Sequence, residues 1–185
     1  YNDDDGILVE PKYYVPIIPM VLVNGSKGIG TVFSTDILNY NPLKIVEYLK
    51  KKLENKTPLP QLMPYYEGFK GEVTKLEGGK RYLFKGIYSV LQGSRIRITE
   101  LPIGVWTDTY KQYLEVLMDK KKQIVVDYKD MSNSVSVDLV VTLAPGILET
   151  LISKKTEYGC TALEKTFKLY TTRTTTNMHM FDSNQ

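Results

Sequence analysis

The chain has 185 residues, of which 42% are hydrophobic and 24% charged, and its formal net charge is +3. These values are typical of a globular protein that buries its own core as one domain or two small ones. A transmembrane helix needs about 20 consecutive apolar residues. The longest apolar run, 15–23, contains two prolines and ends at Asn24, so the sequence predicts no such helix.

The first predicted element is an extended segment over 13–23. Pro16 and Pro19 disfavour a helix there, and the β-branched and aromatic residues around them favour strands. A glycine-rich loop, NGSKGIGT, follows at 24–31. Its spacing excludes a nucleotide P-loop, because Thr31 stands where the lysine should follow the last glycine, and it does not fit the dinucleotide pattern either.

A helix is predicted from Asn41, as its cap, and Pro42, in its first turn, to about residue 55. Its apolar residues recur at helical spacing: Ile45, Val46, Leu49 and Leu53. A proline-containing connector over 57–66 leads to three predicted strands, 71–74, 81–91 and 95–101, with turns at 78–79 and 92–94.

The second half of the chain repeats this mixture of elements. Thr107 is predicted to cap a helix to about 117 that directs Tyr110, Leu114 and Leu117 inward. Strands at 123–128 and 134–143, helices at 144–152 and 161–169, and a final extended stretch follow. The pattern lacks βαβ regularity, so it predicts an α+β fold with a mixed, largely antiparallel sheet and packed helices.

Basic residues concentrate over 68–97, where seven stand against two acidic ones. Within this segment Arg95-Ile96-Arg97-Ile98 alternates strictly, so both guanidinium groups should leave one face of a strand while both isoleucines enter the core. Outward arginines often serve only solubility, but beside this surplus they form a candidate phosphate track.

Few residues are candidates for catalysis or metal binding. The single Cys160 is interpreted as a buried small hydrophobe, and the single His179 as a packing or surface residue. The carboxylates of Asp3, Asp4 and Asp5 should point alternately to opposite faces of an extended segment, which favours a solvated terminus over a metal site. We therefore predict neither catalytic residues nor metal ligands here.

Four blocks of sequence occur together: EPKYYVPIIPMVLVNGSKGIGT at 10–31, ITELPIGVWTDTYKQYLE at 98–115, FKLY at 167–170 and NMHMFD at 177–182. In order and spacing they resemble type IIA DNA topoisomerases of the eukaryotic or viral topoisomerase II kind. Val32 and Leu38 depart from that pattern, which usually has glycine and proline there. The departures lead us to expect an altered backbone path over 32–38.

The resemblance implies a fragment of an ATP-dependent enzyme that makes a transient double-strand break, passes a second duplex and religates. It implies that 1–40 ends a winged-helix region, that 41–170 is a tower domain and that 171–185 is a DNA-contacting strand leading to a coiled coil. The nucleophilic tyrosine, the magnesium-binding TOPRIM region and the ATPase of the family precede residue 1, so the fragment alone should be inactive.

For the full enzyme the resemblance implies Mg²⁺ and ATP as cofactors, although none in this fragment, and a homodimer acting on double-stranded DNA without a membrane partner. The expected location is the nucleus if the source is cellular, or the host cytoplasm or virion if the source is a large DNA virus. An alternative from another class is an autonomous, non-sequence-specific architectural module that bends DNA.

The resemblance also implies which residues contact DNA. Ile29, which is flanked by Gly28 and Gly30, could plug a core on pattern alone, but the family places a wedge here that enters between base pairs from the minor groove. The predicted DNA-binding residues are Asn24, Ser26, Lys27, Gly28, Ile29, Gly30, Thr31, Arg95, Arg97, Lys168, Arg173, Thr174, Thr175 and Asn177.

Overall fold

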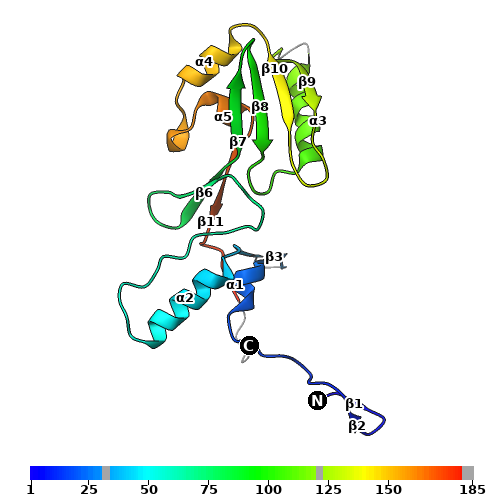
Figure 1. The fold of residues 1–185 in the computed structure, drawn as a ribbon, viewed down its shortest axis with the longest axis vertical. Coiled ribbons are helices and arrows are strands. Elements are labelled where there is room, and N and C mark those ends of the chain that lie inside the picture. The colour runs from blue at the N-terminus through cyan, green and yellow to red at the C-terminus, as the bar shows by residue number, and fades with distance from the viewer. Residues whose placement is uncertain (31–33, 120–122, 181–185) are drawn as a thin grey trace. The chain divides into compact units, whose positions relative to one another are not determined.

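A computed structural model of the chain describes residues 1–30, 34–119 and 123–180 (Figure 1). The chain forms two compact units, one made of Tyr1–Tyr65 and the chain from Asn177 onward, the other of Tyr66–Thr176. The first unit is therefore discontinuous in sequence, because the residues of the second unit come between its two segments along the chain. The region boundaries expected at 40 and 170 stay predictions.

The first unit contains two small hairpins and two helices among its described residues. Its elements are β1 (Asp3–Asp4), β2 (Ile7–Leu8), α1 (Met20–Asn24), β3 (Ser26–Ile29), β4 (Ser34–Ile37) and α2 (Pro42–Leu53). Strand β1 pairs with β2, and β3 with β4, both antiparallel.

Helix α2 begins where the sequence predicted. The side chain of Asn41 accepts hydrogen bonds from the backbone N–H groups of Leu43 and Lys44, which the first turn of a helix leaves without partners. Ile45 faces inward and is 1% exposed, but Leu53 is 83% exposed. The apolar spacing therefore does not lead to burial at Leu53, because the helix ends at this residue.

Helix α1 replaces part of the predicted extended segment. Pro19 is its N-cap, with φ of −69°, and helical residues begin directly afterwards. A proline restrains its own backbone and that of the preceding residue, so it bars the residues before it from a helix more than those that follow. The extended prediction is wrong for 20–23 for this reason.

The described residues of the second unit form two antiparallel sheets. Its strands are β5 (Glu72–Lys75), β6 (Arg81–Lys85), β7 (Ile87–Leu91), β8 (Arg95–Glu100), β9 (Val125–Asp130), β10 (Leu139–Leu143) and β11 (Tyr170–Thr174). Its helices are α3 (Thr107–Met118), α4 (Ile147–Ser153), the 3₁₀ turn Glu157–Gly159 and α5 (Ala162–Thr166). The sheet orders are β7-β8-β10-β9 and β11-β6-β5. The predicted α+β class is confirmed.

One predicted strand, 81–91, is divided between the two sheets at Gly86. A Cβ atom at this position would collide with the backbone carbonyl of Glu100. The glycine therefore lets two backbone segments approach closely where the chain passes from β6 in one sheet to β7 in the other. A register shift between Ile87 and Tyr88 follows at once.

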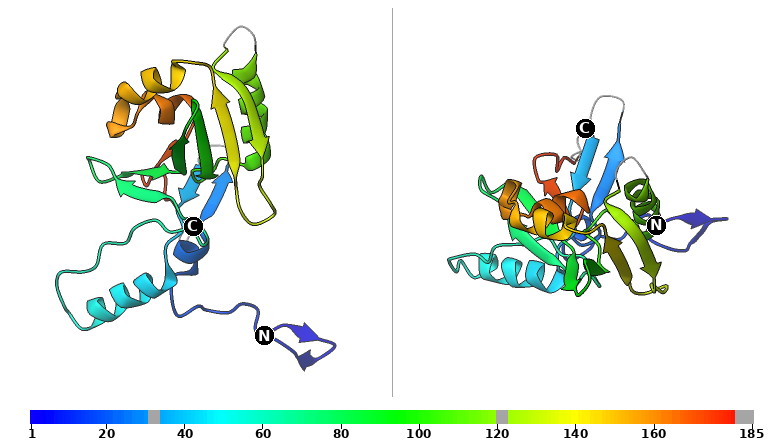
Figure 2. Two further views of the ribbon diagram at one scale, coloured as in Figure 1. Left: turned by 45° about the horizontal axis from the view of Figure 1, so that its top comes forward. Right: turned by 90° about the horizontal axis from the view of Figure 1, so that it is seen from above.

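The core of the second unit lies between the four-stranded sheet and its helices. Ile96, Ile98, Leu139 and Val141 are 0% exposed and pack in one cluster with residues of α3 to α5. Figure 2 shows α3 beside β9 on one face of this sheet. The inward direction predicted for Tyr110, Leu114 and Leu117 is confirmed, since all three are buried.

Several predicted helix boundaries shift by one to three residues. The N-cap of α3 is Trp106, without a side-chain cap, and not Thr107. Helix α5 begins after Thr161 as predicted but ends at Thr166, because Lys168 adopts a left-handed φ of 49° that turns the chain into β11. The basic run 120–122 lies outside the described residues.

Strand β10 starts later than predicted, at Leu139 instead of residue 134. The Asn133 side chain accepts hydrogen bonds from the backbone N–H groups of Val135 and Ser136, which closes a turn of the kind that asparagine favours. Further differences include β9, at Val125–Asp130, and α4, at Ile147–Ser153.

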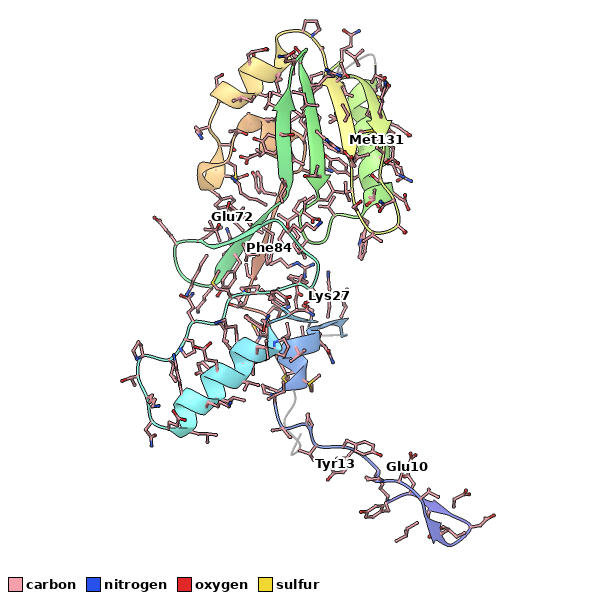
Figure 3. All side chains as sticks on the ribbon, in the orientation of Figure 1. Glu10, Tyr13, Lys27, Glu72, Phe84 and Met131 are labelled. Atoms are coloured by element: carbon pink, nitrogen blue, oxygen red, sulfur yellow. The ribbon has the colours of Figure 1, made fainter. Side chains whose placement is uncertain are left out.

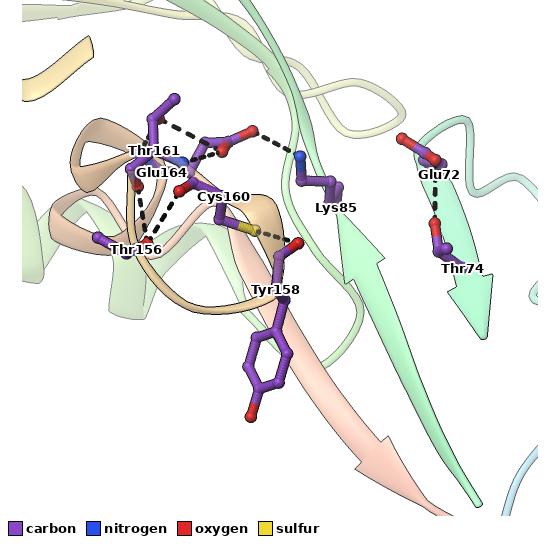
Figure 4. A network of polar contacts seen from close by, with 8 residues as sticks. All are labelled: Glu72, Thr74, Lys85, Thr156, Tyr158, Cys160, Thr161 and Glu164. Atoms are coloured by element: carbon purple, nitrogen blue, oxygen red, sulfur yellow. Dashed lines mark hydrogen bonds and ion pairs between the residues drawn. The ribbon is translucent and has the colours of Figure 1, made fainter. Parts of the chain in front are cut away.

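A polar network joins α5 to β6 (Figure 4). Glu164 accepts hydrogen bonds from Lys85 Nζ at 2.9 Å and from the backbone N–H of Thr161 at 2.6 Å. Burial opposes ionisation of both side chains, but the pairing outweighs it, so the pKa of Glu164 is lowered and that of Lys85 is raised. Cys160, beside this network, is buried as predicted, and burial raises the pKa of its thiol.

Replacing Glu164 with glutamine should lower the free energy of unfolding by roughly 1–3 kcal/mol at about pH 7, because Lys85 loses its charged partner while partly buried. The pKa of Glu164 is lowered from 4.5 in the folded chain, so the stabilisation exists above that value and is lost as the pH falls through the folded pKa. Urea unfolding at about pH 7 and about pH 3 should show the difference shrinking at the lower pH.

The matched control is Glu47→Gln, which removes an exposed carboxylate paired with Lys44 and Lys51 on α2. Solvent screens such pairs, so this variant should unfold like the parent. If both variants lost the same free energy of unfolding, or if the loss in Glu164→Gln did not change with pH, the role assigned to the network would be wrong.

Candidate nucleic-acid interface

The segment NGSKGIGT includes one strand of a hairpin, where a loop was predicted. Strand β3 pairs with β4 so that Lys27 lies opposite Asp36, Gly28 opposite Thr35 and Ile29 opposite Ser34. Figure 3 labels Lys27 on this hairpin. The loop prediction is wrong for 26–29, because the pairing with β4 imposes the strand on a segment whose glycines disfavour one.

The base of the hairpin is fixed by Asn39. Its side-chain amide donates to the backbone carbonyls of Val23 at 3.1 Å and Asn24 at 2.8 Å. Gly25 has φ of +66°, and a Cβ atom there would lie 2.8 Å from the carbonyl oxygen of Ile37. Only glycine therefore fits this junction between α1 and β3 without strain.

Ile29 projects into solvent from the end of β3. Its side chain is 90% exposed, and all four residues of the strand are exposed. A Cβ atom at the neighbouring Gly28 would meet nothing within 4 Å. Of the two outcomes considered for Ile29, the structure has the projecting side chain and not a core plug, while insertion into DNA stays a prediction.

The C-terminal segment lies along the outer side of β4. The Asp36 N–H donates to the Asn177 carbonyl at 2.8 Å, and the Asn177 side-chain amide donates to Ser34 Oγ at 2.7 Å. Thr35 Oγ1 donates to the carbonyl of His179, also at 2.8 Å. The structure thereby brings Asn177 to the strand that pairs with Ile29, although 148 positions of sequence separate the two predicted DNA-binding residues.

The region of the expected altered path is only partly described. Thr31, Val32 and Phe33 lie outside the described residues, as do Phe181 and Asp182 of the last sequence block. Ser34–Ile37 form β4, and Leu38, which follows the strand, is 0% exposed. Burial accounts for an apolar residue at this position.

In the second unit the predicted basic residues of the C-terminal tract are held by α3 and its preceding loop. Lys168 Nζ lies 3.9 Å from the centre of the Tyr113 ring, a cation–π contact. Arg173 lies on β11, an end strand of the three-stranded sheet, and lines a cavity of about 460 Å³ with the loop 102–106. The tract therefore offers two positioned cations.

The threonines of this tract are partly engaged within the unit. Thr171 Oγ1 donates to the carbonyl of Ile103 at 3.0 Å, and Thr175 Oγ1 donates to the carbonyl of Lys80 at 3.3 Å. The hydroxyls of Thr174 and Thr176 are 3.1 Å apart. A threonine hydroxyl that donates its hydrogen bond within the protein can still accept one, but it has no second proton to donate to a phosphate.

Arg95 and Arg97 lie on β8, in a different sheet from Arg173. Their outward alternation is confirmed, since both are exposed while Ile96 and Ile98 are buried. Arg97 forms a bidentate ion pair with Asp138, at 2.8 and 2.6 Å, which lowers the pKa of that carboxylate. Arg95 Nε donates to the carbonyl of Gln92 at 2.9 Å. A phosphate would have to compete with Asp138 for Arg97.

The acidic terminus and the lone histidine are both exposed at the surface. Asp3 and Asp4 form the exposed strand β1, and Asp3 Oδ1 accepts a hydrogen bond from the N–H of Gly6. His179 is exposed. Within 1–30, 34–119 and 123–180, no group of three or more His, Cys, Asp or Glu side chains could hold a metal ion. No helix among these residues is long and apolar enough to cross a membrane.

Comparison with known proteins decides the family. A family model that describes the A subunit of DNA gyrase/topoisomerase IV matches residues 1–185. The chain belongs to this topoisomerase family. The resemblance to type IIA DNA topoisomerases of the eukaryotic kind, predicted from the four sequence blocks, is confirmed by relatives about 40% identical over the whole chain.

Topoisomerase relatives from two organisms illustrate the match. DNA topoisomerase 2 of Drosophila melanogaster is 41% identical over 188 residues, covering 100% of this chain and 12% of that protein. DNA topoisomerase 2 of Plasmodium falciparum is 42% identical over 185 residues, covering 100% of this chain and 13% of that protein. The chain thus spans about an eighth of these topoisomerases.

A solved topoisomerase structure shares the fold. The crystal structure of the Plasmodium falciparum topoisomerase II DNA-binding, cleavage and re-ligation domain superposes with a TM-score of 0.84 at 39% identity. The match covers 100% of this chain and 24% of that one. Both units of the chain therefore have counterparts in a topoisomerase domain of known structure.

The exposure of Ile29 predicts how it affects stability. Ile29→Ala should change the free energy of unfolding by no more than about 0.5 kcal/mol, because an exposed side chain loses little burial. Ile45→Ala, at a site 1% exposed, should cost roughly 2–5 kcal/mol. Urea denaturation of the two variants makes the comparison. A loss at Ile29 as large as that at Ile45 would show that Ile29 is packed in solution.

Proposed function

We propose that this chain grips and bends the DNA segment that a type II DNA topoisomerase cleaves. The observation that carries the proposal is the match of the whole chain to a topoisomerase II DNA-binding, cleavage and re-ligation domain. The projecting Ile29 on a fixed hairpin supports the bending role, and the positioned cations Lys168 and Arg173 support the gripping role.

In the whole enzyme, we propose, a homodimer uses ATP and Mg²⁺ to cut both strands of one duplex, pass a second duplex through the break and religate. In this proposal the sites for ATP and metal belong to other parts of that enzyme. The named relatives come from cellular eukaryotes, which favours a nuclear location. The alternative, an autonomous bending module, is not favoured, because the relatives that match the chain are much longer enzymes.

The bending step follows from the properties of an apolar side chain on a rigid support. An isoleucine that enters between base pairs unstacks one step, at a cost of a few kcal/mol, and kinks the duplex by roughly 20–90°. Gly28 and Gly30 let the backbone approach the groove, and Lys27 on the same strand can meet a phosphate. Flexible pyrimidine–purine steps deform more easily, so selectivity can arise without base contacts.

Ile29→Ala in the complete enzyme should reduce DNA bending and, with it, cleavage, because alanine is too short to unstack a base step. ATP hydrolysis without DNA should stay unchanged. Energy transfer between dyes at the two ends of a duplex measures the bend, and Ile29→Leu is the control that keeps an apolar wedge. Full bending by the alanine variant would remove Ile29 from this role.

Lys168→Ala combined with Arg173→Ala should weaken DNA binding and flatten the logarithmic salt slope by roughly one to two units, since each phosphate contact releases about one counterion. Affinity measured over a series of salt concentrations gives the slope. The double variant Lys50→Ala, Lys52→Ala removes two cations from α2 and should leave the slope unchanged. If the slope survives loss of Lys168 and Arg173, this tract does not touch DNA.

A further inference from the structure

The segment 177–179 supports the β3–β4 hairpin along the outer side of β4. The Asp36 N–H donates to the Asn177 carbonyl at 2.8 Å. The hydroxyl of Thr35 forms a reciprocal pair with the backbone of His179, because it donates to the carbonyl at 2.8 Å and accepts from the N–H at 3.3 Å. The hairpin therefore has a third segment, which comes from the other end of the chain.

One side chain of this segment reaches the position beside Ile29. The Asn177 amide donates to Ser34 Oγ at 2.7 Å, and Ser34 lies directly opposite Ile29 in the pairing of β3 with β4. Opposite residues of an antiparallel pair direct their side chains to the same face of the strands. Asn177 thus holds β4 at the residue whose partner projects into solvent.

The two ends of β4 are held in different ways. Ile37 is 5% exposed and the following Leu38 is 0% exposed, so apolar burial fixes this end. At the other end Ser34 is half-buried, its partner Ile29 is 90% exposed, and all four residues of β3 are exposed. Hydrogen bonds to 177–179 replace apolar packing where Ile29 projects.

An exposed hairpin needs such support if it is to deform DNA. A two-stranded hairpin is at best marginally stable in water by itself, and a glycine within a strand weakens it further. The stacking of base pairs resists insertion of a side chain between them. A hairpin that frays would yield before the duplex does, whereas one that is held along a second edge transfers the displacement to the DNA.

We propose that Asn177 is a positioning residue for DNA bending, which acts through Ser34 to hold the strand that supports Ile29. Thr35 acts in the same way through the backbone of His179. This role differs from the direct DNA contact that the sequence predicts for Asn177. The inference rests on the proposed bending function and adds to it the groups that keep the inserted side chain in place.

Variants of the two partners of one hydrogen bond test the inference in the complete enzyme. Asn177→Ala should lower the ratio of bent to unbent duplex in the complex about three- to tenfold, the factor that corresponds to one net hydrogen bond. Energy transfer between dyes at the duplex ends measures this ratio. Ser34→Ala should reproduce the loss, and the double variant should lose no more than either single variant, because all three lack the same interaction.

Two further variants serve as controls. Ser34→Thr keeps the hydroxyl that accepts from Asn177 and should bend DNA like the parent enzyme. Asn133→Ala is matched to Asn177→Ala, because Asn133 also uses its side chain to fix backbone, at Val135 and Ser136, but belongs to the second unit. This variant should not change the bend.

A second duplex distinguishes a positioning role from general damage to the protein. It carries a mismatched base pair at the step that is bent in the first duplex, which lowers the cost of unstacking. Asn177→Ala should bend this duplex nearly as well as the parent enzyme does, because a less rigid hairpin then suffices. Hydrogen exchange without DNA should be several-fold faster in β4 of this variant and unchanged in β8.

The outcomes separate this inference from the proposed function. If the parent enzyme leaves both duplexes straight, the proposed bending function is wrong and the inference falls with it. If the parent enzyme bends DNA and Asn177→Ala bends it equally, the inference alone is wrong. A loss in Asn177→Ala that Ser34→Ala does not share would indicate a direct DNA contact and overturn the inference, as would a loss that persists on the mismatched duplex.

Discussion

The hydrogen bond from the Tyr110 hydroxyl to the Phe167 carbonyl, 2.7 Å long, determines much of the second unit. Tyr110 is 1% exposed and Phe167 is 0% exposed, so the bond lies inside the core. Burial raises the pKa of Tyr110 far above its ordinary value, which keeps the hydroxyl protonated and able to donate. Without this bond a buried carbonyl would lose its partner where α5 turns into β11.

The consequences of this bond reach the surface in both directions. On one side it fixes α3, and with it the loop that presents Trp106. On the other it fixes the left-handed turn at Lys168, from which β11 runs toward Arg173. Surface residues that are far apart in the sequence are thereby linked to each other through one hydrogen bond in the core. This is how a rigid scaffold positions binding groups at little cost in conformational entropy upon binding.

Local chemistry made some of the fold predictable from sequence. Asn41 caps α2 because its side chain meets N–H groups only two and three residues away, and Thr161 forms a capping box with Glu164 over the same range. The alternation at 95–98 likewise needs no distant information. Strand β3 could not be predicted because its glycines disfavour a strand, and the segment becomes one only through pairing with β4.

The candidate site likewise has features that could be predicted from the sequence and features that could not. Ile29 could be singled out from its flanking glycines and the family pattern, and its exposure agrees with a projecting side chain. The link between Asn177 and Ser34 spans 143 positions, and no periodicity in the sequence encodes it. The ion pair between Arg97 and Asp138 spans 41 positions and was equally hidden. Sequence thus indicated which groups are displayed, but not which of them already have partners.

The return of the chain to the first unit at Asn177 has a consequence for biosynthesis. Strand β4 forms hydrogen bonds with 177–179, and these residues leave the ribosome only after all of 66–176 has been made. The β3–β4 hairpin therefore lacks these hydrogen bonds until the residues of the second unit have been synthesised. Completion of the first unit is therefore a late event in synthesis, and a chain that stalls within the second unit would leave the hairpin of Ile29 without its third segment.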